Sequence, residues 1–188
     1  MGKSSRENEI KLAFPSAGLA REALERAGAR LSIPRRFEDN VVYDRDGGAL
    51  ARSGRVLRVR RDGNRIVLTL KTPVEGTHVH KLKNEFETEV GDQGMLMRIL
   101  AELGFAPAYR YQKYRTSFAL DEVDAELDET PIGTFVELEG GPEAVDRAAA
   151  SLGASPGDYI VSTYRELHEH DALLRGVPVG DLLMTEEA

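Results

Sequence analysis

Apolar and polar residues alternate near the start of the chain, in the stretch RENEIKLAF that covers residues 6–14. One set of alternate positions is charged and the other is apolar: Glu7, Glu9 and Lys11 against Ile10, Leu12 and Phe14. A β-strand sends successive side chains to opposite faces, so this pattern predicts a strand with one apolar face and one charged face.

The same period of two residues recurs along much of the chain and predicts further extended segments. These segments are residues 38–44, 55–61, 65–71, 79–90, 109–120, 121–128 and 133–139. Asp62 and Gly63 lie between two of them, and an Asp-Gly pair at such a position is typical of a tight β-hairpin. Most neighbouring segments are close enough in sequence to pair in antiparallel fashion.

Fewer segments show the spacing of a helix, and several of these carry helix-capping residues. The expected helices cover residues 15–29, 92–105, 142–153 and 162–175. Ser16 and Asp92 stand at N-cap positions, and Gly28 and Gly104 lie near the C-terminal ends. The chain therefore predicts one α+β domain over residues 1–188, with a core from about 7 to 168 and a helical tail over 169–188.

The charged faces of these strands are sorted by sign. Like charges stand two residues apart in Glu7/Glu9, Arg58/Arg60, Glu85/Glu87, Lys113/Arg115 and Glu137/Glu139. Such neighbours lie about 7 Å apart on a strand and repel one another. A sheet with one solvated face is the ordinary reading, but it gives no reason for this sorting. An eight-stranded antiparallel barrel gives one, with helices outside and the charged faces lining its interior.

Composition limits the class of protein. The chain has 188 residues, of which 41% are hydrophobic and 30% charged, which is ordinary for a globular domain. It contains no cysteine, so disulfide and thiolate chemistry are excluded. We find no apolar run long enough for a membrane helix and no signal-peptide pattern, and we therefore expect a cytoplasmic protein without membrane contact. The net charge of −7 argues against broad binding to nucleic acid.

Charge is unevenly distributed along the chain. Residues 52–71 contain seven bases and one acid, whereas residues 121–139 contain eight acids and no base. The candidate lining cations are Lys11, Arg58, Arg60, Lys71, Lys83, Lys113 and Arg115; the candidate acids are Glu7, Glu9, Glu85, Glu87, Asp121, Glu137 and Glu139. Charges inside a barrel must pair or bind ions. A polyanion bound together with Mg²⁺ or Mn²⁺ suits this lining, because bases bind phosphate oxygens and carboxylates bind hard cations.

Several motifs, taken in their order along the chain, resemble the CYTH domain family of triphosphate tunnel metalloenzymes. The Glu7-x-Glu9-x-Lys11 stretch is similar to the opening ExExK signature of that family. The later matches are VLRVRRDG (56–63), LTLK (68–71), KLKNEFETEV (81–90), KYR (113–115), Asp121 with GTFVELE (133–139), and STYRELH (162–168). The resemblance spans about residues 7–168. Lys83 departs from it, because many members have arginine there and lysine lacks the bidentate fork.

The resemblance implies a tunnel that binds triphosphate-containing small molecules with Mg²⁺ or Mn²⁺. It implies metal binding by Glu7, Glu9, Glu137 and Glu139, with Asp121 or Glu87 contributing, and phosphate binding by Arg58, Arg60, Lys71, Lys83, Lys113 and Arg115. Lys11 and Glu9 would be catalytic, with Lys11 contacting the transferred phosphate or the nucleophile. Members of the family include triphosphatases and class IV adenylate cyclases.

Three functions therefore stand as hypotheses. A metal-dependent triphosphatase is preferred, a class IV adenylate cyclase that forms cyclic AMP and pyrophosphate is the alternative, and a non-catalytic polyphosphate- or nucleotide-binding protein is the third. The set of acids favours an enzyme, because carboxylates repel a polyanion unless metal intervenes. Tyr43, Tyr109 and Tyr111 could stack on adenine, although packing explains them equally well. The sequence leaves the oligomeric state open, and a homodimer is one of the options.

Other candidate motifs have simpler explanations. His78 and His80 share a strand face beside a loop and are a weak metal pair. His168 and His170 are two residues apart on an expected helix, so their rings diverge. Asp44 opens a stretch that resembles the start of a calcium loop, but that loop lacks its closing glutamate, and a turn is the better interpretation.

Overall fold

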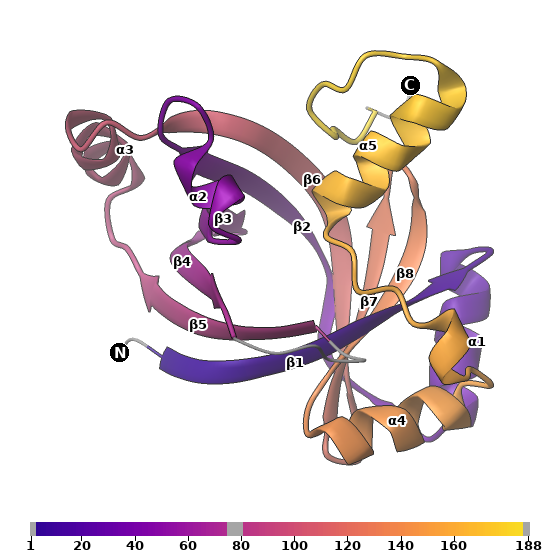
Figure 1. Ribbon diagram of the computed structural model, residues 1–188. Helices are drawn as coiled ribbons and strands as arrows, with labels where there is room; N and C mark the ends of the chain where they lie inside the picture. The colour runs from indigo at the N-terminus through magenta and orange to yellow at the C-terminus, as the bar shows by residue number, and fades with distance from the viewer. Residues whose placement is uncertain (1–2, 75–80, 186–188) are drawn as a thin grey trace.

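Eight strands form a closed barrel in the computed structural model, which describes residues 3–74 and 81–185 (Figure 1). Their order around the barrel is β1-β5-β4-β3-β2-β6-β7-β8, and each neighbouring pair is antiparallel. The strands are β1 (Lys3–Phe14), β2 (Arg30–Asp44), β3 (Val56–Asp62), β4 (Arg65–Pro73), β5 (Lys81–Glu89), β6 (Ala106–Leu120), β7 (Val123–Thr130) and β8 (Gly133–Glu139). The predicted α+β barrel is confirmed.

Helices lie outside this barrel. They are α1 (Ala17–Arg26), α2 (Ala49–Arg52), α3 (Gln93–Glu102), α4 (Pro142–Ser151) and α5 (Tyr164–Arg175), with a 3₁₀ turn at Pro156–Asp158. The hydroxyl of Ser16 and the carboxylate of Asp92 cap α1 and α3 as the sequence predicts. Thr163 and Glu166 form a capping box at the start of α5. Among the described residues, no helix is long and apolar enough to span a membrane.

The apolar faces of the strands point outward and are covered by helices. One core lies between β1, β6, β7 and β8 and the helices α1 and α4, and it buries Ile10, Leu127 and Leu138. A second core lies between β2 and β3 and helix α3, where Tyr43 and Leu57 pack near Leu96 and Leu100. Because the apolar faces are outside, the charged faces must line the interior.

Two strand boundaries differ from the prediction. Strand β2 begins at Arg30 instead of residue 38, because β6 is long enough to pair with the whole of 30–44. Pro34 lies in this extension, where the ladder shifts register between Ile33 and Arg36. The segment 121–128 starts as a turn, with Asp121 at φ 51°, and β7 begins only at Val123. A positive φ of this kind is typical of turns and not of strands.

The chain after α4 forms a strap that is anchored to two strands. Ile160 exchanges two backbone hydrogen bonds of 2.9 Å with Lys11 of β1. Beyond α5, the amide of Leu182 donates to the carbonyl of Arg110 at 2.9 Å, and its carbonyl accepts from the amide of Gln112 at 2.8 Å. Of the described part of the predicted helical tail, residues 169–185, only the part up to Arg175 is helical. These anchors hold α5 against the barrel, with Tyr164 buried.

The core beneath α1 and α4 gives a direct test of the arrangement. Replacing Leu127, which is 1% exposed, by alanine should lower the free energy of unfolding by about 2–5 kcal/mol. Leu174→Ala is the control, because Leu174 is 74% exposed and its loss should cost about 0.5 kcal/mol or less. Urea unfolding followed by circular dichroism measures both values. Equal losses in the two variants would contradict the packing described here.

Candidate active site

Strand register places the predicted charged residues on the interior of the barrel. Residues directly opposite on neighbouring strands share a face. Lys11 lies opposite Glu137, and Glu9 lies opposite Glu139, across β1 and β8. On the other side of β1, Lys71 of β4 lies opposite Glu85 of β5, with Lys71 Nζ 3.7 Å from Glu85 Oε1. The interior therefore brings together side chains that are far apart in sequence.

Lys11 lies at the centre of the β1–β8 wall and is 2% exposed. Its Nζ is 3.1 Å from Glu9 Oε1 and 3.2 Å from Glu137 Oε1. Burial alone would lower the pKa of Lys11, but the two carboxylates outweigh burial and raise it above its usual value. Lys11 therefore remains protonated at physiological pH and acts as a fixed positive charge.

Asp128 of β7 is an interior acid at the centre of this network that the sequence interpretation missed. It is fully buried, and its carboxylate accepts hydrogen bonds from Lys113 Nζ at 2.7 Å, from Arg115 Nε at 2.7 Å and from Arg115 Nη2 at 2.6 Å. The hydroxyl of Tyr164 donates a further bond of 2.6 Å. Asp128 therefore fixes two predicted phosphate-binding side chains and ties them to α5.

The structure does not bring Asp121 to this site. Asp121 is exposed in the β6–β7 turn, outside the strand that carries Asp128. The sequence interpretation began this strand at residue 121 without assigning its faces. In such a strand Asp121 would share the apolar face of Val123 and Leu127, so alternation gave no reason to place it in the lining. The alternation of Asp124, Glu126 and Asp128 was the sequence signal for the correct face.

Arg115 of β6 links β7 to β8, because it pairs with both Asp128 and Glu137. Burial would lower the pKa of Arg115, but the carboxylates of Asp128, Glu137 and Glu38 raise it well above its usual value. Burial would likewise raise the pKa of Glu137, but Lys11, Lys113 and Arg115 hold it well below its usual range. Arg115 and Glu137 therefore stay ionised, in a continuous network of alternating charge.

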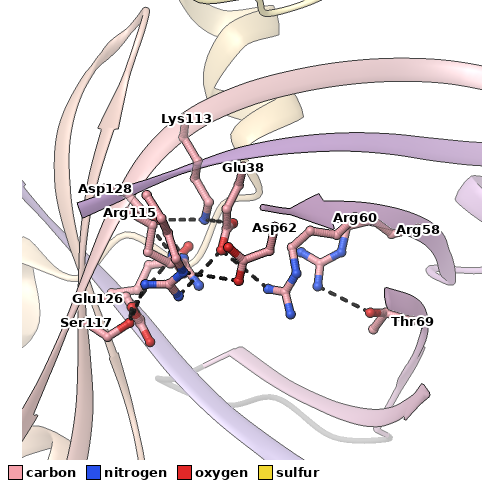
Figure 2. A network of polar contacts seen from close by, with 12 residues as sticks. Glu38, Arg58, Arg60, Asp62, Thr69, Lys113, Arg115, Ser117, Glu126 and Asp128 are labelled. Carbon is pink, nitrogen blue, oxygen red and sulfur yellow. Dashed lines mark hydrogen bonds and ion pairs between the residues drawn. The ribbon is translucent and has the colours of Figure 1, made fainter. Parts of the chain in front are cut away.

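The β3 wall holds its arginines more loosely. Arg58 donates to Tyr111 Oη at 3.2 Å and to Thr69 Oγ1 at 3.4 Å, and Arg60 donates to Glu87 at 3.5 Å. The Nε atoms of both arginines are buried without a hydrogen-bond partner among the described residues. Figure 2 shows these two side chains on the side of the network away from Asp128. This wall therefore has donor capacity for an anion.

Among the described residues, Lys83 bonds to a backbone carbonyl and not to the central network. Lys83 Nζ donates to the carbonyl of Gly54 at 3.0 Å, in the loop before β3. The backbone of Glu7 pairs with that of Lys83, but the side chain of Glu7 lies outside the described part of the structure. His78 and His80 also lie outside the described residues.

Glu38 of β2 is a second interior acid that the sequence interpretation missed. It is fully buried, opposite Lys113 of β6. Burial would raise its pKa, but nearby cations, led by Arg115 and Lys113, lower the pKa to about 2. The strand 38–44 was predicted without resolving its faces, so the inward direction of Glu38 had no sequence signal beyond alternation.

The acids of β1 and β8 fit a hard divalent cation by their donor chemistry. Glu9, Glu137 and Glu139 offer only carboxylate oxygens, which Mg²⁺ and Mn²⁺ prefer, and the register brings them to adjacent strands. Within the described residues, no three acids or histidines are already grouped around one point. Lys11 instead bridges Glu9 and Glu137.

Three side chains that could have served other functions are structural. The Asp44 carboxylate accepts hydrogen bonds from the backbone amides of Arg45, Leu50 and Ala51, so it fixes the turn into α2. His168 is buried and lies 3.1 Å from Tyr109 Oη through its Nδ1. Tyr43 is buried in the core beneath α3.

Comparisons with known proteins agree with this geometry. A family model described as the CYTH domain matches residues 5–164. No curated protein matches the chain. The PH1819 protein from Pyrococcus horikoshii OT3 is 23% identical with a TM-score of 0.74, and the match covers 88% of this chain and 99% of that one.

Two further solved structures share the fold. A protein from Vibrio parahaemolyticus, described as a candidate adenylate cyclase, is 17% identical with a TM-score of 0.73, over 88% of this chain and 98% of that one. HpAC1 from Hippeastrum, described as a candidate adenylyl cyclase with a dominant triphosphatase activity, is 20% identical with a TM-score of 0.58, over 93% and 97% of the two chains.

The bond from Tyr164 to Asp128 leads to a prediction on stability. Tyr164→Phe should lower the free energy of unfolding by about 1.5–3 kcal/mol, because a buried carboxylate loses a donor. Tyr159→Phe is the matched control, since its hydroxyl donates to Asp146 at 2.9 Å at the surface and its loss should cost about 1 kcal/mol or less. Urea titration of both variants gives the comparison. A Tyr164→Phe cost no larger than the control would contradict the central position of Asp128.

Proposed function

The chain belongs to the CYTH domain family, and on that premise we propose that it is a metal-dependent phosphohydrolase acting on triphosphate-containing small molecules. The main support for the proposal is the charge pattern of the barrel interior. The interior of a closed barrel holds a row of cations from β1, β3 and β6 facing carboxylates from β1 and β8, all largely removed from water. A polyphosphate with a divalent metal has the charge pattern that this interior complements.

The phosphate chain would be bound by the basic residues of four strands. These are Arg58 and Arg60 of β3, Lys71 of β4, Lys83 of β5, and Lys113 and Arg115 of β6. Arg58 and Arg60 contribute most to initial binding, because their hydrogen bonds are long and their Nε donors are unused among the described residues. Guanidinium groups bind phosphate oxygens in bidentate fashion, which fixes orientation as well as charge.

Lys11 would neutralise charge at the transferred phosphoryl group. It is held between two carboxylates and stays protonated, so it is suited to electrostatic stabilisation and unsuited to accepting a proton. Phosphoryl transfer depends mainly on positioning and charge neutralisation, which is the task that this geometry serves.

Glu7, Glu9, Glu137 and Glu139 would hold the metal, with Glu87 contributing from β5. When bound, the metal supplies Lewis-acid polarisation of a phosphate oxygen and lowers the pKa of a bound water. Glu9 has two tasks in this proposal, since it also fixes Lys11. The acids set the proposal apart from a simple anion-binding protein, in which they would repel the ligand.

Hydrolysis is preferred over cyclisation because the candidate adenine-stacking rings are engaged elsewhere. Tyr43 packs in the core, and Tyr109 is buried beside His168. Tyr111 accepts a hydrogen bond from Arg58 and stacks on Tyr109 at 6.0 Å between ring centroids. These rings therefore serve packing and arginine placement. HpAC1, which shares the fold, is described as having a dominant triphosphatase activity.

A product assay tests the proposal. Purified protein is given inorganic triphosphate, thiamine triphosphate or ATP with Mg²⁺ or Mn²⁺, and the products are resolved by phosphorus NMR. We expect orthophosphate from at least one triphosphate, and loss of turnover when EDTA removes the metal. Pyrophosphate with cyclic AMP from ATP would establish the cyclase instead. Tight binding without any product would leave the binding-protein hypothesis.

Glu9→Gln tests the carboxylate wall. The change keeps the side-chain shape but removes the charge that would bind metal and fix Lys11, so kcat should fall by about 100-fold or more. Glu143→Gln on the exposed face of α4 removes the same charge outside the barrel and should keep full activity. Initial rates at saturating metal measure both. Full activity of Glu9→Gln would remove the β1–β8 wall from the mechanism.

A further inference from the structure

Glu38 is held differently from Asp128, the other interior acid that is fully buried among the described residues. Both carboxylates are fully buried. Asp128 accepts hydrogen bonds from Lys113, Arg115 and Tyr164. Neither oxygen of Glu38 has a hydrogen-bond partner among the described residues. A buried carboxylate without hydrogen bonds is unfavourable, so its presence requires a compensating interaction.

Three cations surround Glu38 at ion-pair distance. Glu38 Oε1 lies 3.6 Å from Arg36 Nη2 and 3.8 Å from Arg60 Nη1, and Oε2 lies 3.8 Å from Lys113 Nζ. Figure 2 shows Glu38 between Lys113 on one side and Arg60 on the other. These separations are too long for hydrogen bonds, but charge–charge attraction is strong at this range in a buried site. Glu38 therefore attracts the cations without itself accepting any of their N–H donors.

The cations need such a counter-charge because they also repel one another. Burial lowers the pKa of Arg60, and the neighbouring charges of Arg58 and Arg115 lower it further, whereas Glu38 opposes the shift. Arg36 and Arg115 stand directly opposite each other on β2 and β6. Without a negative charge in their midst, Arg60 and Lys113 would move apart or toward solvent.

We infer that Glu38 is a positioning residue, which holds Arg60 of β3 and Lys113 of β6 in place for the substrate phosphates without occupying their donors. This inference rests on the proposed function, because it gives those two side chains their task. Glu38 itself need not contact the substrate, since its charge acts through the cations.

The inference predicts a split between kcat and KM in Glu38→Gln. Removing one negative charge makes the interior more attractive to a polyanion, so KM should fall or stay the same. Misplacing Arg60 and Lys113 weakens the alignment of the reacting phosphate, so kcat should fall by about tenfold or more. A residue that only supported the fold would lower Tm and the fraction of active enzyme without this split.

Asp62→Asn is the matched control for bulk charge. Asp62 stands directly opposite Glu38 on β3, and its carboxylate accepts from Arg36 Nε at 3.1 Å. The change removes the same charge at the same level of the barrel, so KM should fall or stay the same while kcat is kept. A loss of kcat in Asp62→Asn as large as in Glu38→Gln, or a kcat in Glu38→Gln within twofold of the unmodified protein, would overturn the inference.

If Glu38→Gln does not fold, Glu38→Asp tests the positioning role of Glu38 instead. Attraction through space tolerates a carboxylate that is one methylene shorter, so Glu38→Asp should keep kcat within about threefold. A tenfold loss of kcat in folded Glu38→Asp would overturn the inference.

A measurement that needs no turnover separates this inference from the proposed function. The arginine Nε–H signals are recorded by ¹H–¹⁵N NMR, and the signal of Arg60 is assigned through its loss in Arg60→Lys. Its order parameter should fall in Glu38→Gln and remain unchanged in Asp62→Asn. An unmodified protein that turns over no triphosphate would refute the proposed function, while an ordered Arg60 in Glu38→Gln would refute the positioning role.

Discussion

Charge balance inside the barrel is the constraint on which the rest of the structure depends. The apolar strand faces are covered outside by α1, α3 and α4, so the charged faces have only the interior left to them. A charge removed from water is tolerated only with a partner of opposite sign. The network that runs from Glu9 through Lys11, Glu137 and Arg115 to Asp128 satisfies this condition. The need to pair charges that are removed from water therefore shapes both the barrel and its interior.

The same balance divides the interior cations into two groups: those of β6 are held tightly, and those of β3 are held loosely. Lys113 and Arg115 already donate to Asp128, so an incoming phosphate must share these donors. Arg58 and Arg60 have long hydrogen bonds and unused Nε donors among the described residues, so a phosphate can bind them without breaking strong contacts. On the proposed function, this difference predicts capture of the anion on β3 and its orientation on β6.

Alternation allowed the strands and their inward faces to be predicted, because it depends only on residue class. Sorting by sign identified Glu9, Arg58 and Glu137 for the same reason. Asp128 was missed because the faces of 121–128 were not assigned, although alternation groups it with Asp124 and Glu126. Glu38 was missed because the inward face of 38–44 depends on how the strand pairs, which one sequence does not show. Asp121 was placed in the lining without such an assignment, and the structure puts it in an exposed turn with positive φ.

Low sequence identity with a shared fold follows from the same physics. Proteins that are 17% and 23% identical to this chain retain TM-scores of 0.73 and 0.74, because a barrel needs alternation and outer packing rather than particular residues. The chemistry of the site tolerates fewer sequence changes than the fold, since it depends on individual charges at individual interior positions. Residues such as Glu38, which contact cations but lie outside the motifs, can therefore change without loss of the barrel. On the proposed function, such residues set the order and net charge of the wall that binds phosphate, so we expect substrate preference to depend on them.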